Sequence, residues 1–503
     1  MRKYLYSLVL SGMMLSLHAQ QTSWQHQDLY STGIFGVSSN RAYVELLKGK
    51  KAKEVIVAVI DGGVDTNHTD LKPVLGVKGK YGWSYLGSSK GNIHHETQEL
   101  TRLIRTGQQR FPNPEQPPVD TSGLADYLKI RSIYRKKLSQ LGRQISSVES
   151  YKLIADTIFA GIGKSDPDII DLKRYVPETL LQNSIKGIMI GELNGDSTLT
   201  IQGLRKGLAF NLEHMMAERD YALNLNYDPR GLVGDQMDNL KQNKYGSHDV
   251  MGPDASHGSH VSGIIGAVRN NGIGIDGIAD YVKILNIRAV PDGDERDKDV
   301  ANAIIYAADH GAKIINMSFG KPYSPNKPRV DDAVKYAMSK DVLLVHAAGN
   351  NGLDLDNEVD YFPNKIYADG SGLAKAWLNV GANGPKDNQQ LVASFSNFGK
   401  TKVDVFAPGV GIYSTVPGSE YRLMDGTSMA APVVSGIAAL IRSYYPKLTA
   451  IQVKEIIMKS VIKVDHDVLV VKKGRRINIP FADVCVSGGV ANAFQALKLA
   501  ASY

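Results

Sequence analysis

Residues 425–432 read Asp-Gly-Thr-Ser-Met-Ala-Ala-Pro, and an apolar segment typical of a helix follows over residues 433–445. This order places Ser428 at or near a helix N-terminus, where free backbone N–H groups and the helix dipole favour developing negative charge. A serine hydroxyl is a weak nucleophile until a base takes its proton. The stretch therefore predicts a reactive serine if the chain also supplies a histidine and a carboxylate, and a helix N-cap is the simpler alternative.

The composition is that of an ordinary globular protein. The chain has 503 residues, of which 43% are hydrophobic and 22% charged, enough for one large domain with an insertion or for two domains. The formal net charge is +7, but the basic residues are spread along the chain. We therefore expect a solvated basic surface and no nucleic-acid partner.

The first 20 residues predict a signal peptide. Arg2 and Lys3 precede an apolar run over residues 4–17, and cleavage is expected near residue 19 or 20. The run is short for a membrane span and no other long apolar segment follows, so we expect a periplasmic or secreted protein without a span after signal removal. Only a short stretch lies between the signal and the first predicted core strand, so we expect no large N-terminal prodomain to be removed. The single cysteine, Cys485, lies in an apolar run and is predicted to be core.

An acidic residue ends the first predicted strand. Residues 54–60 read Glu-Val-Ile-Val-Ala-Val-Ile, a run typical of a strand buried on both faces of a parallel sheet. The run ends at Asp61, which Gly62 follows. Open α/β sheets have their active sites at the carboxyl ends of such strands. The alternative for Asp61 is a turn residue or N-cap.

Residues 78–242 predict a mainly helical insertion. Proline and polar clusters separate amphipathic segments, the clearest being residues 124–141, in which apolar residues recur at helical spacing. A second helix is expected after Ser165-Asp166-Pro167 and a third over residues 202–221. We therefore divide the chain into residues 1–20, 21–77, 78–242 and 243–503, in which the second and fourth parts form one domain interrupted by the third.

The fourth part alternates helices with strands. His257 stands at the start of a predicted helix with His260 one turn later, a position that suits a base better than a zinc ligand, because the third ligand and the intervening Glu of zinc motifs are missing. The alternation predicts an α/β fold with a mostly parallel sheet and helices on both faces. The expected strands are residues 282–290, 312–318, 342–347, 378–381 and 403–406, and the expected helices are residues 300–310, 330–339, 433–445, 450–460 and 490–500.

Asp61, His257 and Ser428 occur in an order that differs from that of α/β-hydrolases and of chymotrypsin-like enzymes. In these residues and their neighbours the chain resembles the subtilases, the subtilisin-like serine proteases. The resemblance rests on Asp-Gly-Gly at 61–63, His-Gly-Ser-His-Val at 257–261 and Gly-Thr-Ser-Met-Ala-Ala-Pro at 426–432. It covers residues 55–76 and about 249 to the C-terminus, and implies a subtilisin-like three-layer fold. The long spacing from Asp61 to His257 is similar to that of subtilases resembling those of Bacteroidetes.

The resemblance implies a role for each of these residues. Ser428 is expected to be the nucleophile, His257 the general base and acid, and Asp61 the carboxylate that orients the imidazole. Asn350 is similar to the oxyanion asparagine of the family, which donates to the tetrahedral intermediate beside the Ser428 N–H. Gly62 and Ser259 depart from the family, which has Ser or Thr at the first position and Thr at the second. No cofactor is expected for the chemistry.

The resemblance also implies where a substrate binds. An extended protein or peptide is expected to pair with an edge strand, with Ser318, Phe319, Gly320, Ala348 and Gly349 as contact residues. Phe319 replaces a commoner leucine, which leaves the size of the pocket open. The acidic loop 354–360 lies where the family builds its main specificity pocket; it either favours basic substrate residues or is a solvated loop.

Asp70 and the loop 269–275 together resemble a structural calcium site of subtilisins. The expected ligands are Asp70, Asn271 and the carbonyls of Arg269, Ile273 and Ile275, an oxygen set that suits a hard cation. The alternative is an ordinary turn capped by Asp70.

We therefore predict an exported serine endopeptidase of the subtilase type. The alternatives are a catalytically silent protein and a peptide ligase on the same scaffold. We also expect the insertion to pack at the rim of the cleft and to limit access to it. The oligomeric state and the natural substrate do not follow from the sequence.

Overall fold

The computed structural model describes residues 23–116, 120–195, 199–236, 239–358 and 360–503. The predicted signal peptide therefore lies outside the described residues. The chain divides into two compact units, one formed by Met1–His94 with Pro229–Tyr503 and the other by His95–Asp228. Among the residues described, none of the helices has the length and apolar character that crossing a membrane requires.

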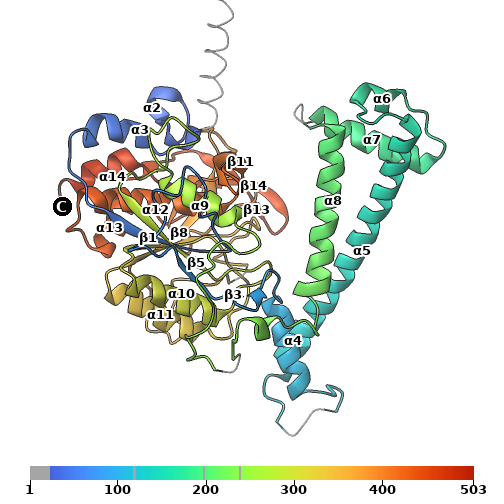
Figure 1. Cartoon of the computed structure of the whole chain (residues 1–503), viewed down its shortest axis with the longest axis horizontal. Helices are drawn as coiled ribbons and strands as arrows, with labels where there is room; N and C mark the ends of the chain where they lie inside the picture. The colour runs from blue at the N-terminus through green and yellow to red at the C-terminus, as the bar shows by residue number, and fades with distance from the viewer. Residues whose placement is uncertain (1–22, 117–119, 196–198, 237–238, 359) are drawn as a thin grey trace, which may run out of the picture. The chain divides into compact units, whose positions relative to one another are not determined.

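A nine-stranded sheet forms the centre of the first unit (Figure 1). Its strand order is β12-β15-β9-β8-β7-β6-β1-β5-β2, and all pairs are parallel except β12 with β15. The strands are β1 Val55–Asp61, β2 Gly82–Ser84, β5 Val282–Arg288, β6 Ile314–Met317, β7 Leu343–Ala347, β8 Trp377–Asn383, β9 Val405–Pro408, β12 Ile462–Lys463 and β15 Gly489–Val490. The predicted mostly parallel sheet is confirmed.

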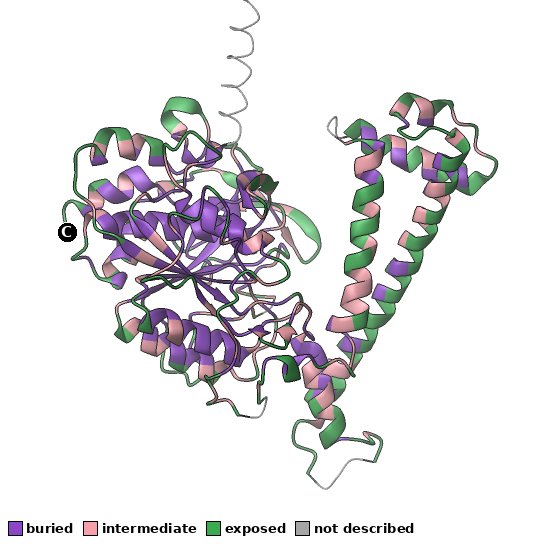
Figure 2. Cartoon of the chain, viewed as in Figure 1, coloured by how far each residue is buried: buried purple, intermediate pink, exposed green. Residues whose placement is uncertain are grey.

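Helices cover both faces of this sheet because its strands are apolar on both sides. In β1, Val57 and Val59 pack into one hydrophobic cluster, and Ala58 and Ile60 pack into another. The first cluster is closed by α9 Ser256–Gly266, α12 Thr427–Tyr444, α13 Ala450–Lys459 and α14 Ala493–Ala500, and the second by α10 Asp297–Asp309 and α11 Lys327–Ser339. Figure 2 shows that strands and inner helix faces are buried while outer helix faces are exposed. Cys485 is 1% exposed, so its predicted core position is confirmed.

The smaller elements surround the sheet. Two hairpins, β10 Ile412–Val416 with β11 Glu420–Met424 and β13 Asp467–Lys472 with β14 Arg475–Pro480, lie outside it and were not predicted. The others are η1 Trp24–His26, α2 Leu29–Thr32, α3 Ser39–Ala42, η2 Tyr43–Leu47, β3 Gly87–Ser88, β4 Gly91–Asn92, η4 Arg230–Leu232 and η5 Phe481–Asp483.

The second unit is helical, as predicted, but it is shorter than the predicted insertion 78–242. It contains α4 Glu99–Arg110, α5 Leu124–Ile162, α6 Ile169–Arg174, α7 Leu180–Gly195, α8 Ile201–Ala217 and η3 Glu218–Ala222. Residues such as Ile158, Leu172 and Met189 form a core of its own. The predicted boundaries were too wide because β2 pairs with β5 in the main sheet and η4 belongs to the first unit.

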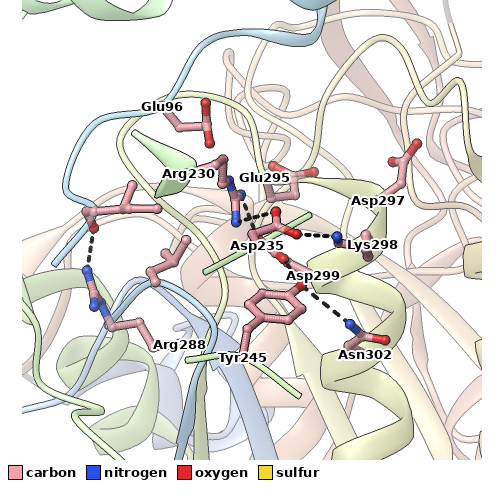
Figure 3. A network of polar contacts seen from close by, with 12 residues as sticks. Glu96, Arg230, Asp235, Tyr245, Arg288, Glu295, Asp297, Lys298, Asp299 and Asn302 are labelled. Carbon is pink, nitrogen blue, oxygen red and sulfur yellow. Dashed lines mark hydrogen bonds and ion pairs between the residues drawn. The ribbon is translucent and has the colours of Figure 1, made fainter. Parts of the chain in front are cut away.

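A buried polar network fixes the segment around Arg230 to the start of α10 (Figure 3). The Arg230 guanidinium lies 2.6 Å from a carboxylate oxygen of Asp299 and 3.5 Å from one of Asp235. Lys298 also binds Asp235, and the Tyr245 hydroxyl donates to Asp299. Because these charged side chains are at most 4% exposed, each is compensated inside the protein.

Candidate active site

Asp61 and His257 are brought together from β1 and α9. His257 lies in the first turn of α9, and its Nδ1 is 2.8 Å from Asp61 Oδ1 and 3.0 Å from Oδ2. The two segments approach closely because Gly258 follows His257: a Cβ there would lie 2.1 Å from the carbonyl oxygen of Gly63. With Nδ1 donating to the carboxylate, Nε2 is left as the proton acceptor.

Two carboxylates control the charge of His257. Burial alone lowers the pKa of the imidazole, but the charge of Asp61, its hydrogen bond and the charge of Asp254 together raise the pKa above its ordinary value. The side chain nevertheless keeps 44% exposure, so a substrate can reach it. His257 therefore has the surroundings of a base that is stabilised when it takes up a proton.

Ser428 lies in the first turn of α12, earlier in that helix than the predicted start at residue 433. Its Oγ donates to the carbonyl oxygen of Ser318 at 3.1 Å, and Ser318 Oγ donates to the carbonyl oxygen of Ser428 at 3.0 Å. Pro432 explains the second bond: it has no N–H for the helical bond to the Ser428 carbonyl, which is therefore open to Ser318. The two serines are thus held against each other.

The register of the sheet puts Ser318 near Asp61. Ile60 pairs with Met317 between the parallel strands β1 and β6, so Asp61 and Ser318 are the next residues at the same edge. Asp61 holds His257, and Ser318 holds Ser428. Three segments far apart in sequence therefore meet at the carboxyl ends of β1 and β6. Transfer of the Ser428 proton to His257 requires the hydroxyl to turn from the Ser318 carbonyl.

Asn350 is fixed beside the same helix start. Its Oδ1 accepts hydrogen bonds from Thr427 N and Thr427 Oγ1, both at 2.9 Å, which leaves its NH2 group directed elsewhere. A Cβ placed on Gly426 would lie 3.5 Å from both Asn350 Nδ2 and Ser428 N. The space in front of Gly426 is therefore flanked by two N–H donors, an arrangement that suits an oxyanion.

Thr427 and Gly426 are part of the serine motif, and neither was among the predicted site residues. Thr427 Oγ1 also accepts from Gly349 N at 3.0 Å, so it ties the loop after β7 to α12. Gly426 has φ +154°, a conformation that strongly favours glycine. The proximity of both residues to Ser428 was the available signal.

The predicted substrate segment leaves the sheet after β6. The backbone ladder of β6 with its neighbours ends at Met317, and among the described residues the chain next pairs at Lys321, in an antiparallel bridge with Phe362. Between them, the Ser318 oxygen accepts the Ser428 hydroxyl. The predicted contact residues Ser318, Phe319 and Gly320 therefore lie beside Ser428, and Ala348 and Gly349 lie directly before Asn350.

Three carboxylates of the acidic loop have partners within the protein. Asp354 is 3% exposed and forms an ion pair with Lys472 of the β13–β14 hairpin at 2.8 Å. The Asp356 carboxylate accepts from Thr401, and Asp360 pairs with Lys402 at 3.0 Å. These partners reduce the charge that the loop offers to a basic substrate residue, and the preference for such residues stays a prediction.

The predicted calcium residues lie together, but hydrogen-bond donors surround the buried Asp70 carboxylate. Asp70 Oδ1 accepts from Asn271 Nδ2 at 2.7 Å, and Oδ2 accepts from Ile275 N at 3.1 Å and the Tyr421 hydroxyl at 3.2 Å. The Asn271 oxygen accepts from Ile273 N. The oxygen chemistry of the set fits a hard cation, but Asn271 must turn its amide before its oxygen can reach one.

His260 has a structural environment. Burial lowers its pKa to about 4, so the ring is neutral near pH 7. Its Nε2 lies 3.0 Å from the carbonyl oxygens of Ile412 and Arg422, one in each strand of the β10–β11 hairpin. The ring therefore holds this hairpin against α9.

Comparisons with known proteins identify the family of this chain. A family model described as the Subtilase family matches residues 52–482. Thermophilic serine proteinase of Bacillus sp. (strain AK1) is 44% identical over 189 residues, which cover 37% of this chain and 43% of that protein. Thermitase of Thermoactinomyces vulgaris is 41% identical over 188 residues, covering 37% and 61%. Subtilisin BL of Lederbergia lenta is 35% identical over 199 residues, covering 39% and 67%.

The matched region thus spans less than two thirds of the length of the first two relatives. A solved structure of proteases from Pseudoalteromonas arctica aligns with a TM-score of 0.41 and 27% identity, covering 51% of this chain and 80% of that chain.

Proposed function

Because the chain belongs to the subtilase family, we propose that it is an exported serine endopeptidase that hydrolyses peptide bonds through an acyl-enzyme on Ser428. The strongest support is that two hydrogen-bonded pairs of residues lie next to each other at the carboxyl edge of the sheet. Asp61 binds His257, and the neighbouring Ser318 binds Ser428. Acyl transfer through serine needs a carboxylate that orients an imidazole and an alcohol that the imidazole can deprotonate. Asp61, His257 and Ser428 supply these three groups.

Each residue then has a chemical task. Ser428 Oγ turns from the Ser318 carbonyl, gives its proton to His257 Nε2 and attacks the substrate carbonyl. Asp61 holds the imidazole in the correct tautomer and stabilises its charged form. Asn350 Nδ2 and Ser428 N donate to the oxyanion that forms. His257 then gives the proton to the leaving amine. Water attacks the acyl-enzyme with His257 again as the base, and the proton returns to Ser428 Oγ as the acyl group leaves.

Hydrolysis of casein and of short peptides by the purified protein tests this proposal. We expect turnover with the wild type and a loss of about a thousandfold or more with Ser428→Ala. A fluorophosphonate should label the wild type and not the variant. An unlabelled wild type would favour a catalytically silent protein, and products joined to an added amine acceptor would favour a ligase.

The proposed periplasmic or secreted location rests on the N-terminus. Arg2, Lys3 and the apolar run after them have the pattern of a signal peptide. N-terminal sequencing of the protein from its natural host tests this. We expect the mature chain to begin near residue 20. A mature protein that keeps Met1 would contradict export by this signal.

We further propose that Asp70 and its loop bind calcium weakly. The residues that would hold it are Asp70, Asn271, Arg269, Ile273 and Ile275, the last three through their carbonyls. Binding should be weak because the donors on Asp70 compete with the ion. We expect millimolar calcium to raise the Tm of the wild type and a chelator to reverse this, with no calcium effect in Asp70→Asn. Equal melting curves with calcium and with chelator would show that no ion binds here.

A further inference from the structure

Tyr361 lies between the two segments that are expected to bind substrate. Gly320 belongs to one segment and Gly349 to the other. A Cβ on Gly320 would lie 2.3 Å from Tyr361 Cε1, and a Cβ on Gly349 would lie 2.9 Å from Tyr361 Cζ. The tyrosine ring therefore rests against both glycines and occupies space that any other residue at either glycine would fill.

The backbone around Tyr361 is held firmly. Phe362, the next residue, exchanges two backbone hydrogen bonds of 2.9 Å with Lys321, the residue after Gly320. The carbonyl oxygen of Tyr361 accepts from Asn364 Nδ2 at 3.1 Å. Lys321 is itself anchored, with its Nζ 2.7 Å from the Glu295 carbonyl oxygen and 2.8 Å from Asp297 Oδ1. The Tyr361 ring therefore belongs to a segment whose backbone is hydrogen-bonded to Lys321, directly after the predicted substrate-contact residues 318–320.

The Tyr361 side chain is itself uncharged. Burial and the charges of Glu295 and Asp294 raise the pKa of Tyr361, so its hydroxyl stays protonated at working pH. The ring of His346 has its centroid 6.0 Å away, and burial lowers the pKa of that imidazole to about 4.

We propose that Tyr361 closes the pocket for the substrate side chain on the acyl side of the scissile bond and limits that side chain to small residues such as Ala, Ser or Gly. This rests on the proposed function, because it assigns a substrate class to the same site. A large side chain would have to share its space with the Tyr361 ring. Overpacking of this kind costs about 1–3 kcal/mol, which corresponds to roughly 5- to 150-fold in kcat/KM.

The test uses the full-length protein and three peptide nitroanilides that differ only in the residue before the scissile bond: Ala, Leu or Phe. The measured quantity is the ratio of kcat/KM for Phe to that for Ala within each enzyme, which does not depend on the active fraction. We expect a wild-type ratio of about 0.1 or less. Tyr361→Gly should raise the ratio at least tenfold, with Leu in between, while the matched control Tyr361→Phe, which keeps the ring, should retain the wild-type ratio.

The outcomes separate the pocket from the proposed function. A wild type that cleaves after Phe as well as after Ala overturns the pocket alone, and so does an unchanged ratio in Tyr361→Gly. If that variant does not fold, Tyr361→Ser replaces it. The wild-type ratio of kcat/KM tests the preference for small residues without any variant. A wild type that cleaves none of the three and is not labelled by a fluorophosphonate overturns the proposed function and the pocket with it.

Discussion

Gly426 faces the space that is flanked by the two N–H donors of the candidate oxyanion site. Its φ is +154°, and two N–H donors would lie 3.5 Å from a Cβ at this position, which leaves no space for a methyl group beside an oxyanion. We expect Gly426→Ala to lower kcat on a peptide substrate by about a hundredfold, because it both strains the backbone and blocks one donor. Gly474→Ala is the matched control. Gly474 also has positive φ, +74°, but nothing lies within 4 Å of its Cβ position. Equal losses in the two variants would mean that strain, and not the oxyanion space, limits activity.

The pH dependence of activity should follow His257. The charges of Asp61 and Asp254 raise its pKa by stabilising the protonated ring, whereas a general base must be neutral. Activity should therefore rise as pH increases through this raised pKa. The protonated ring also contributes to the free energy of unfolding, and this contribution changes with pH in the opposite direction. It is fully present below the unfolded-state pKa of His257 and is lost as pH rises through the folded-state pKa.

Asp254→Asn isolates one of these two charges. Asparagine can still accept the hydrogen bond that Asp254 receives from Ser256 N at 2.8 Å. We expect the acid limb of the kcat/KM profile to move to lower pH at low ionic strength, because the charge of Asp254 helps to raise the pKa of His257. The shift should shrink in high salt. A limb that does not move would exclude Asp254 as an influence on the base.

At the residue scale, short motifs could be recognised but side-chain direction could not. Ser428 and Asn350 stand in motifs whose residue types suit their expected tasks, and these roles remain predictions. The direction of the acidic side chains in residues 354–360 depends on Lys472 and Lys402, which are distant in sequence. The position of Tyr361 depends on Gly320 in the same way. No local pattern contains that information.

At the element scale, apolar runs predicted the buried strands because a parallel sheet covered on both faces needs them. The β10–β11 hairpin was missed because β11 is only five residues long and largely exposed. The start of α12 was placed too late because Pro432 suggests a helix boundary. In the structure the proline lies inside the helix, and Ser318 bonds the carbonyl that the proline leaves open.

The buried network at α10 gives a prediction about this element. Arg230→Ala leaves the carboxylates of Asp299 and Asp235 buried beside one another without that guanidinium. We expect the free energy of unfolding to fall by about 3–5 kcal/mol, because an uncompensated buried charge is costly. Thermal or denaturant unfolding measures this. Lys400→Ala, which removes an exposed ion pair with Asp483, should cost less than about 1 kcal/mol. Similar losses in the two variants would contradict a structural role for the network.

At the scale of the whole molecule, the candidate site is built entirely from one unit. Asp61, His257, Asn350 and Ser428 all lie in the unit formed by Met1–His94 and Pro229–Tyr503. Both hydrophobic clusters on the faces of the sheet belong to it as well. The unit His95–Asp228 has a separate core. The sequence predicted this insertion because its helical pattern interrupts the α/β alternation, but its edges could not be predicted, since β2 is only three residues long.

Replacing residues 95–228 by a flexible Gly-Ser linker tests whether the first unit is self-sufficient. We expect the shortened protein to fold and its Ser428 to react with a fluorophosphonate, because the sheet, both clusters and the four candidate residues remain. Turnover of a short peptide should stay within about threefold of the full chain, since no candidate residue is removed. Turnover of a folded protein substrate should rise if the insertion limits access, as the sequence led us to expect. The same linker carrying Ser428→Ala controls for contaminating proteases. Unchanged rates on both substrates would exclude the access role, and loss of labelling in a folded variant would show that the second unit contributes to the site itself.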